Sequence, residues 1–449
     1  MSQQDIPLAR TLGLASATAL GLGAMIGAGI FVLTGLGAGE AGPALILAFA
    51  LNGVIAVIVG ACYAELAAML PRDGGVYVWA KPAFGPLIGF FSGWMSWFAH
   101  AIACALYATA FGSFTVELIN VTVGFEAATN LHWRVFASIS LLAALLWVNY
   151  RGAGNTGRLE IVITALKIAI LLVIITGGFM AMSGDSTPGN AYTPFMPEGW
   201  LGLVGAMGLT FVAFEGYEVI VQTAEEAKEP SRTIPRAIML SIAVAVTIYL
   251  LVAVVLFGGI IVPDGSPVYQ FLGQLGELGI MEAAGQFIPY GKPILLIAGL
   301  ASTASALNAT IYGSTRIAYA LGRDGDLPGV FAKVHPAYRT PYRAIQITGL
   351  IMLVATLTLP IKDIAAAADI MFLLVFVLVC ATVIRLRNRW PDRLRPFRVA
   401  LVPIVPMIGI AAGLILSVAL LRISLIAWLT AIIWMVFGFV VHRLRQTGV

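Results

Sequence analysis

Charged residues are scarce in this chain. Asp, Glu, Lys and Arg make up only 11% of its 449 residues, whereas 60% are hydrophobic, and the mean hydropathy is +0.95. A soluble domain carries about a quarter of its residues as charged groups, so the composition excludes a soluble globular protein. It is the composition of a protein that lies in a lipid bilayer.

Cysteine and histidine are also few, and several catalytic motifs are missing. Cys62, Cys104 and Cys380 lie in apolar stretches without the spacing of a disulfide or metal framework, and the four histidines are scattered. The chain has no P-loop, no H-E-x-x-H and no G-x-S-x-G, and its early glycines lack the dinucleotide-binding spacing. We therefore expect no catalytic residues, no metal and no cofactor.

Long apolar runs fill nearly the whole chain. A helix needs about 20 apolar residues to cross ~30 Å of hydrocarbon, and about twelve such runs recur with no room for a soluble domain. The sequence thus predicts an all-α membrane protein with a single domain over residues 1–449. The predicted spans are 12–36, 42–70, 84–118, 133–150, 159–182, 200–224, 236–262, 292–321, 343–360, 364–386, 400–421 and 424–442.

Lysine and arginine are distributed unevenly between the two sides of this bundle. With a cytoplasmic N-terminus, nearly all of the 26 lysines and arginines fall in cytoplasmic loops. Arg134, Lys292, Lys362 and Arg422 fall on the opposite side, and Lys167 lies within a span. The positive-inside rule then predicts a cell-membrane protein with both termini in the cytoplasm. The pI near 9.0 reflects this topology and indicates no nucleic-acid partner.

The first span contains a glycine-rich segment, Gly21–Phe31, with four glycines within nine residues. A break in a membrane helix leaves backbone amides and carbonyls that cost several kcal/mol each unless a partner satisfies them. Amides at the start of a second half-helix can bind an anion, and carbonyls at the end of the first can bind a cation. The alternative is a G-x-x-x-G packing face made by Gly23 and Gly27.

A second break is predicted in the sixth span, where Gly216 stands between Glu215 and Glu218 in an apolar segment. Breaks in helices 1 and 6, which begin two groups of five helices, indicate an inverted-repeat transporter with a binding site at the membrane midplane. Glu215 could neutralise a substrate amine, relay a proton or serve as a packing carboxyl. Glu218, one turn further on, is interpreted as structural.

Two further spans carry candidate residues for ion coupling. Lys167 lies about ten residues into its helix, roughly 15 Å from its start, where a lysine must find a partner inside the bundle. It can exchange a proton there or simply tether two helices. Ser302 and Ser305 lie on one face of the eighth span and either join helices or occupy a cation-type site beside Lys167.

Three stretches of the chain resemble the amino acid–polyamine–organocation (APC) superfamily of transporters. They are GAMIGAGIF at 23–31, YAELAAMLPRDGGVYVWAKPAFG at 63–85 and FVAFEGYEVIVQTAEEAKEPSRTIPRAI at 211–238. The resemblance implies a leucine-transporter-type fold with inverted repeats at 12–182 and 200–386 and two additional helices at 400–442. It also implies that Lys167, with Glu160, matches the proton-coupled members, in which a lysine on helix 5 replaces a sodium ion. Glu215 is not a fixed position of that pattern.

The two breaks predict the binding site of a small zwitterion. The substrate carboxylate would accept hydrogen bonds from the amides of Ala28, Gly29 and Ile30, with Gly27 and Gly216 leaving room for close approach. The ammonium would be held by the carbonyl groups of Met25, Ile26, Phe211, Val212 and Glu215. Phe211 and Phe214 are candidates for an apolar lid or for ordinary packing. A charged Lys167 would bind the Gly23 carbonyl and release it when neutral.

These expectations combine into one function, the secondary active transport of amino acids by proton symport with alternating access. An amino acid or polyamine exchanger is the nearest alternative, and a non-transporting membrane scaffold or subunit is a more remote one. A membrane enzyme is disfavoured because the sequence shows no nucleophile–base pair. The sequence leaves the choice between cationic, small neutral and broad substrates open, and it does not predict an oligomeric state.

Overall fold

A computed structural model of the protein describes residues 12–71, 74–124, 131–152, 157–183, 191–224, 227–263 and 265–446, without the side chains of 157–160 and 446. Glu160 therefore has no described side chain. Within these ranges the chain forms helices and loops, and β pairing is limited to an isolated bridge between Leu12 and Ala227. The predicted all-α class is confirmed.

The helices follow one another along the whole described chain. The long ones are α1 (Leu14–Met25), α2 (Ala28–Ala41), α3 (Leu45–Met69), α5 (Pro86–Val123), α6 (Leu131–Arg151), α7 (Gly157–Met182), α8 (Gly199–Thr210), α10 (Pro230–Gly259), α13 (Gly291–Arg323), α14 (Tyr342–Thr358), α15 (Ile361–Arg389), α16 (Ile404–Ile423) and α17 (Leu425–Gln446). The short ones are η1 (Gly42–Ala44), α4 (Val76–Phe84), η3 (Phe211–Phe214), α9 (Tyr217–Gln222), α11 (Val268–Leu275), η5 (Gly276–Leu278), α12 (Gly279–Phe287) and η6 (Gly329–Ala332).

Ten helical stretches of the described chain are long and apolar enough to cross a membrane, and Tyr342–Thr358 is a shorter apolar helix. The stretch Leu14–Met69 includes α1, α2 and α3. Some helices extend beyond the predicted spans: α5 continues to Val123, and α10 begins at Pro230. Apolar runs end where polar residues begin, whereas a helix continues into the polar headgroup region, so hydropathy alone underestimates helix length.

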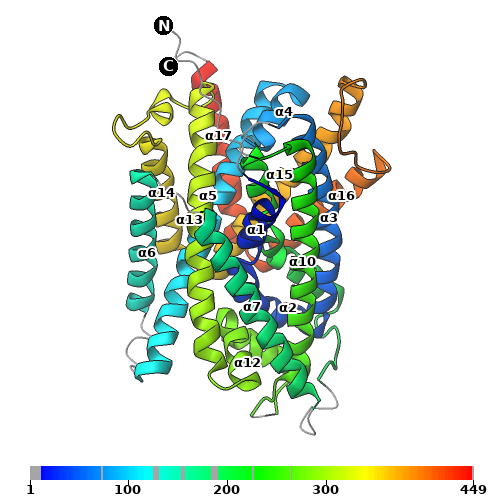
Figure 1. Ribbon diagram of the computed structural model, residues 1–449, viewed down its shortest axis with the longest axis vertical. Coiled ribbons are helices and arrows are strands. Elements are labelled where there is room, and N and C mark those ends of the chain that lie inside the picture. Colours follow the sequence, from blue (N-terminus) through cyan, green and yellow to red (C-terminus); the bar gives the residue numbers. More distant parts are fainter. Residues whose placement is uncertain are drawn as a thin grey trace.

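The long helices stand side by side, and α1 lies inside the bundle (Figure 1). It packs against α7, α9, α10 and α13. Helix α6 stands at the edge of the bundle beside α14. Only 11% of its apolar 18-residue stretch is buried inside the protein. The interrupted first helix is therefore enclosed by other helices, where its free backbone groups are shielded from lipid.

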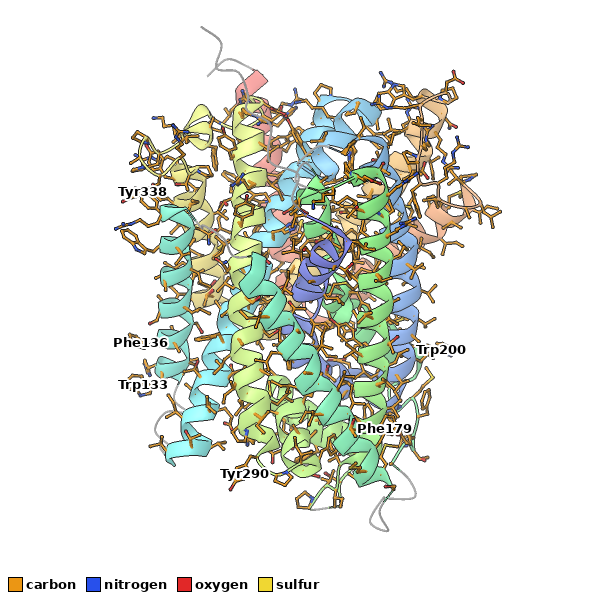
Figure 2. All side chains as sticks on the ribbon, in the orientation of Figure 1. Trp133, Phe136, Phe179, Trp200, Tyr290 and Tyr338 are labelled. Atoms are coloured by element: carbon orange, nitrogen blue, oxygen red, sulfur yellow. The ribbon has the colours of Figure 1, made fainter. Side chains whose placement is uncertain are left out.

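The outer surface of the bundle carries large apolar and aromatic side chains. Figure 2 labels six aromatic ones around the bundle, with Phe179 and Tyr290 toward its lower end and Tyr338 toward its upper end. Tyr290 and Trp200 are 82% and 69% exposed. Exposed aromatic rings of this kind are typical of the two membrane–water interfaces, where an amphipathic ring contacts both apolar and polar layers.

The few basic residues predicted on the non-cytoplasmic side are all in ion pairs. Each pairs with at least one glutamate, so the positive charge at that end is neutralised. The pairs are Arg134–Glu277, Lys292–Glu117, Lys292–Glu282, Lys362–Glu40 and Arg422–Glu198.

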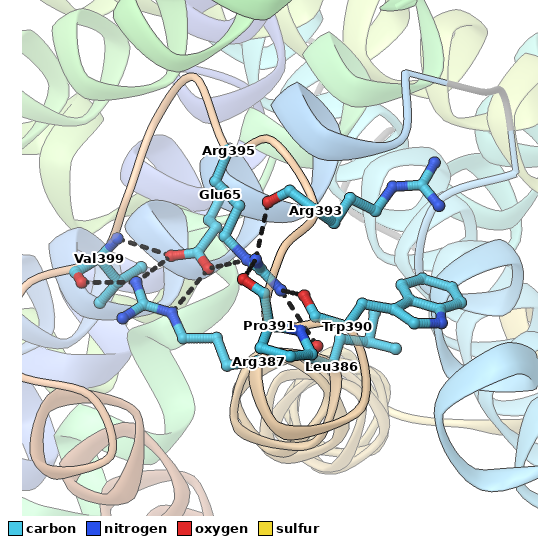
Figure 3. Close-up of polar contacts among 8 residues, drawn as sticks. All are labelled: Glu65, Leu386, Arg387, Trp390, Pro391, Arg393, Arg395 and Val399. Carbon is cyan, nitrogen blue, oxygen red and sulfur yellow. Dashed lines mark hydrogen bonds and ion pairs between the residues drawn. The ribbon is translucent and has the colours of Figure 1, made fainter.

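A buried polar network joins α3 to the end of α15 (Figure 3). The Glu65 carboxylate, on a residue that is only 1% exposed, accepts hydrogen bonds from Arg387 Nε at 2.9 Å and Nη2 at 2.6 Å. It also accepts one from the Val399 amide at 2.6 Å. Such bidentate, charge-assisted bonds are among the strongest polar contacts in proteins. They fix α3 and α15 to each other at the end of the bundle that also holds α4.

Arg395 completes this network from the loop that follows α15. Its guanidinium lies 3.4 Å from a Glu65 oxygen and donates to the carbonyl oxygens of Leu386 at 3.0 Å and Trp390 at 2.8 Å. Leu386 belongs to the last turn of α15, where its carbonyl also accepts the Trp390 amide at 2.9 Å, and Trp390 directly follows the helix. Burial lowers the pKa of the Arg395 guanidinium. Arg395 thus caps the C-terminal end of α15 and also anchors the loop that follows it.

Candidate functional site

The predicted break in the first helix is present. Helix α1 ends at Met25 and α2 begins at Ala28, and Ile26 and Gly27 between them leave the helical conformation. Ser302 of α13 donates to the carbonyl oxygens of Ile26 at 2.7 Å and Gly27 at 3.1 Å. A side chain from a neighbouring helix therefore satisfies carbonyl groups that the break exposes.

The predicted break in the sixth helix is present as well. Helix α8 tightens into η3, Glu215 is extended with ψ of 162°, and α9 begins at Tyr217. Gly216 has φ of +120°, a conformation that only glycine adopts readily. A Cβ atom at Gly216 would also lie 2.7 Å from both the Cβ of Ala24 and the amide nitrogen of Met25. The second break therefore needs a glycine for its conformation and for its packing.

The two breaks lie against each other. Gly216 contacts the end of α1, and a Cβ atom at Gly29 would lie only 2.5 Å from the Cα of Ala213 in η3. Tyr249 of α10 joins them: its hydroxyl lies 2.6 Å from the carbonyl oxygen of Met25 and 2.8 Å from that of Ala213. Sequence reasoning missed Tyr249, because one tyrosine in an apolar helix has no local pattern that marks it.

Lys167 lies where the sequence analysis placed it. Its side chain is buried at 1% exposure, and Nζ donates to the Gly23 carbonyl oxygen at 3.0 Å. In an uninterrupted helix the amide of Gly27 would donate a hydrogen bond to the Gly23 carbonyl, but α1 ends at Met25. The lysine thus contacts α1 one turn before the break. Ser305, 7% exposed, lies one turn from Ser302 on α13.

The remaining predicted residues are buried around the breaks. Ala28, Gly29 and Ile30 form the first turn of α2, where backbone amides have no helical partners. The Phe214 ring lies 5.1 Å from the Tyr249 ring, and the Phe211 ring lies 5.9 Å from that of Phe376. Both phenylalanines are fully buried and Val212 is 4% exposed. These contacts fit a lid and ordinary packing equally.

A polar cavity lies on the α4 side of the second break. It is lined among others by Tyr63, Ser96, His100 and Glu218. The Nε2 atom of His100 lies 3.7 Å from Glu218 Oε1, and the Gly216 amide lies 3.5 Å from Glu218 Oε2. Two titratable groups, His100 and Glu218, thus lie close to the second break, on the side of the bundle where α4 begins.

Beside this cavity, α4 is tied to the loop after α13. The Tyr77 hydroxyl donates to Asp326 at 2.6 Å, and Lys81 Nζ also binds Asp326, at 2.7 Å. Burial and the hydrogen bond to Asp326 raise the pKa of the Tyr77 hydroxyl. This pairing holds α4 across the end of the bundle, next to the His100 cavity.

One acidic residue near the second break was not singled out from the sequence. Asp369 of α15 is 0% exposed, and α15 packs against η3. A signal was available, because a lone aspartate in an apolar span is by default a candidate functional residue. Its carboxylate and that of Glu215 form no hydrogen bond with described residues.

Comparison with known proteins decides the family. A family model described as amino acid permease matches residues 12–443, nearly the whole chain. The chain belongs to the amino acid permease family. Permeases are multi-pass membrane proteins that transport their substrates and are not enzymes.

Named relatives of this permease carry different substrates. A methylthioribose transporter of Bacillus subtilis is 33% identical over 97% of this chain and 93% of that protein. The branched-chain amino acid permease BcaP of the same organism is 32% identical over the same shares of the two chains. Cationic amino acid transporter 4 of Mus musculus is 29% identical over 86% of this chain and 61% of its own.

Proposed function

We propose that this permease carries amino acids across the cell membrane by secondary active transport. The observation that carries the proposal is the meeting of two helix breaks inside the bundle, joined by Tyr249. The first turn of α2 offers backbone amides to a carboxylate, and the carbonyl groups that end α1 and η3 attract an ammonium. An amino acid carries both groups.

The layout of the helices supports alternating access, and the distribution of charge supports one orientation in the membrane. The interrupted helices α1–α2 and α8–α9 begin the two groups expected for inverted repeats. Counting Leu14–Met69 as two crossings, the ten apolar stretches of the described residues together with α14 would make twelve. The orientation we propose places the end with α4 and the Glu65 network in the cytoplasm. The opposite end is the one whose basic residues are paired with glutamates, which suits the positive-inside rule.

Proton coupling is the second part of the proposal, with Lys167 as the coupling group. A charged Lys167 holds α7 to α1 through the Gly23 carbonyl at 3.0 Å. A neutral amine has a lone pair and donates a weaker bond, so loss of the proton loosens α1 from α7 next to the break. Ser302 keeps the carbonyl oxygens of Ile26 and Gly27 bonded in either protonation state.

The test is uptake of radiolabelled amino acids by proteoliposomes at two pH values, with and without a sodium gradient. We expect an inward proton gradient to drive accumulation without sodium and Lys167→Ala to abolish that accumulation. Thr176→Ala on the exposed side of the same helix is the matched control and should behave like the unaltered protein. Full proton-driven accumulation by Lys167→Ala would refute the coupling role.

The same vesicles distinguish the exchanger, the main alternative. An exchanger would show efflux stimulated by external substrate, with no accumulation driven by pH. A chain that only serves as a scaffold would show neither flux nor thermal stabilisation by amino acids.

A further inference from the structure

Two buried carboxylates near the second break form no hydrogen bond within the described part of the chain. Glu215 directly follows η3 and is 5% exposed, and Asp369 on α15 is 0% exposed. Each of their four carboxyl oxygens is buried without a hydrogen bond to the described residues. The Val212 amide approaches Asp369 but does not form a bond of standard geometry. The two residues belong to one region, because α15 packs against η3 and Glu215 directly follows η3.

Unpartnered carboxylates are rare inside proteins, because a buried charge without a counter-charge is very unfavourable. The nearby titratable groups do not supply one. Glu218 has the same sign, and His100 faces Glu218 at 3.7 Å. No set of three or more His, Cys, Asp or Glu side chains in the described ranges could hold a metal ion. A proton or an organic cation remains as the partner of Glu215 and Asp369.

Aromatic rings surround the same place. On α15, Phe372 and Phe376 follow Asp369 at helical spacings of three and seven residues, which puts them on its face. The Phe376 ring lies 5.9 Å from that of Phe211 and 6.0 Å from that of Tyr217. The Tyr217 hydroxyl is a further buried group that forms no hydrogen bond with the residues that the structure describes. Ring faces beside carboxylates favour ammonium and guanidinium ions over a bare proton.

We propose that Glu215 and Asp369 form a subsite for the cationic end of the substrate. The inference rests on the proposed function, in which the two breaks hold the substrate carboxylate and α-ammonium. A second ammonium or a guanidinium then lies between Glu215 and Asp369, and the substrate is an amino acid with a cationic side chain. One carboxylate balances this cation, and the other accepts a hydrogen bond from it and keeps its own proton.

The first test uses the unaltered protein in proteoliposomes. Lysine and norleucine have similar chains, but only lysine carries the terminal ammonium. We expect unlabelled lysine to compete for radiolabelled lysine uptake at least about tenfold better than norleucine, the gain of one charge-assisted contact. Cadaverine has both amines of lysine but no carboxylate. Weak competition by cadaverine would show that the substrate is an amino acid. Competition equal to that of lysine would show that the substrate is a diamine.

The second test uses Asp369→Asn and Glu215→Gln, which keep the size of each side chain and remove its charge. Each should raise the KM for lysine by about tenfold or more, and Asp369→Asn, at a residue outside the groups that hold the α-ammonium and carboxylate, should leave neutral amino acid uptake unchanged. Asp363→Asn in the first turn of the same helix is the control and should leave lysine uptake intact. Retained neutral uptake shows that a variant has folded.

The outcomes separate this inference from the function on which it rests. Equal competition by lysine and norleucine, or a parallel loss of lysine and neutral uptake in Asp369→Asn, overturns the cation subsite. In the first case amino acid transport itself still stands. If no amino acid is carried at all, the proposed function fails.

Discussion

The Lys167 ammonium nitrogen lies 3.0 Å from the Gly23 carbonyl oxygen, one turn before the break that separates α1 from α2. A membrane-embedded lysine needs such an acceptor because it cannot reach water. Since the acceptor belongs to the interrupted helix, the proton coupling proposed above would link the charge of Lys167 to the position of α1. Several variants can separate this coupling from the binding of substrate.

Lys167→Ala should separate exchange from accumulation. The breaks and their free amides and carbonyls remain in this variant, so substrate can still bind and cross, but no proton is moved with it. We expect counterflow of amino acid between equal internal and external pools to persist while accumulation driven by a proton gradient disappears. Loss of counterflow along with accumulation would show that Lys167 supports the fold or the binding site rather than coupling.

Gly216→Ala should disrupt the second break. A side chain at φ of +120° is strained, and the new Cβ would lie 2.7 Å from Ala24 and Met25. We expect a loss of roughly 1–3 kcal/mol in stability from the strained conformation alone, seen as a lower unfolding temperature in detergent, together with loss of uptake. Gly265→Ala is the matched control, because Gly265 has φ of +71° but no atom near its Cβ position. Its uptake should stay near normal.

Tyr249→Phe should weaken the contact between the breaks. The ring and its packing against Phe214 are kept, but the hydroxyl near Met25 and Ala213 is lost. Leaving a buried carbonyl without its donor costs about 1–3 kcal/mol, so we expect a lower unfolding temperature and a higher KM for the substrate. Tyr192→Phe removes a single bond to a carbonyl away from the breaks and should leave the KM unchanged. Equal KM values in the two variants would contradict a role for Tyr249.

Glu65→Gln should be among the most destabilising single changes at a polar residue. It leaves the Arg387 guanidinium and the nearby Arg395 without their counter-charge, and breaking a buried pair typically costs about 3–5 kcal/mol. Glu229→Gln breaks an exposed pair with Arg232 and should change stability by less than about 1 kcal/mol. Thermal unfolding of the two variants in the same detergent measures the difference. Similar unfolding temperatures would show that the Glu65 network does not hold α3 to α15.

The sequence was most informative where a residue conflicts with its surroundings. Glycines in an apolar helix, such as Gly27 and Gly216, predicted both breaks, because an uninterrupted membrane helix has no need of them. A lysine in an apolar helix, Lys167, predicted a partner inside the bundle for the same reason, and its contact with Gly23 is present. The family followed from short motif strings rather than from composition, and the family model confirms it.

Other parts of the site depend on contacts between distant segments. Tyr249 comes within hydrogen-bond distance of residues 224 and 36 positions away, and no local pattern encodes such a meeting. Asp369 could have been found from its charge, but its proximity to Glu215 depends on how α15 packs against η3. The roles of these residues stay predictions until uptake is measured.

The Tyr249 phenol carries a single hydrogen, yet it stands between two acceptors. At any instant the hydroxyl donates its hydrogen bond to the carbonyl oxygen of Met25 or to that of Ala213. The other carbonyl oxygen can then accept a hydrogen bond from a different donor. Under the proposed function, an ammonium that binds one of these oxygens would leave the phenol hydrogen to the other. Reorientation of one O–H bond would then link substrate binding at the first break to the hydrogen bonding of the second.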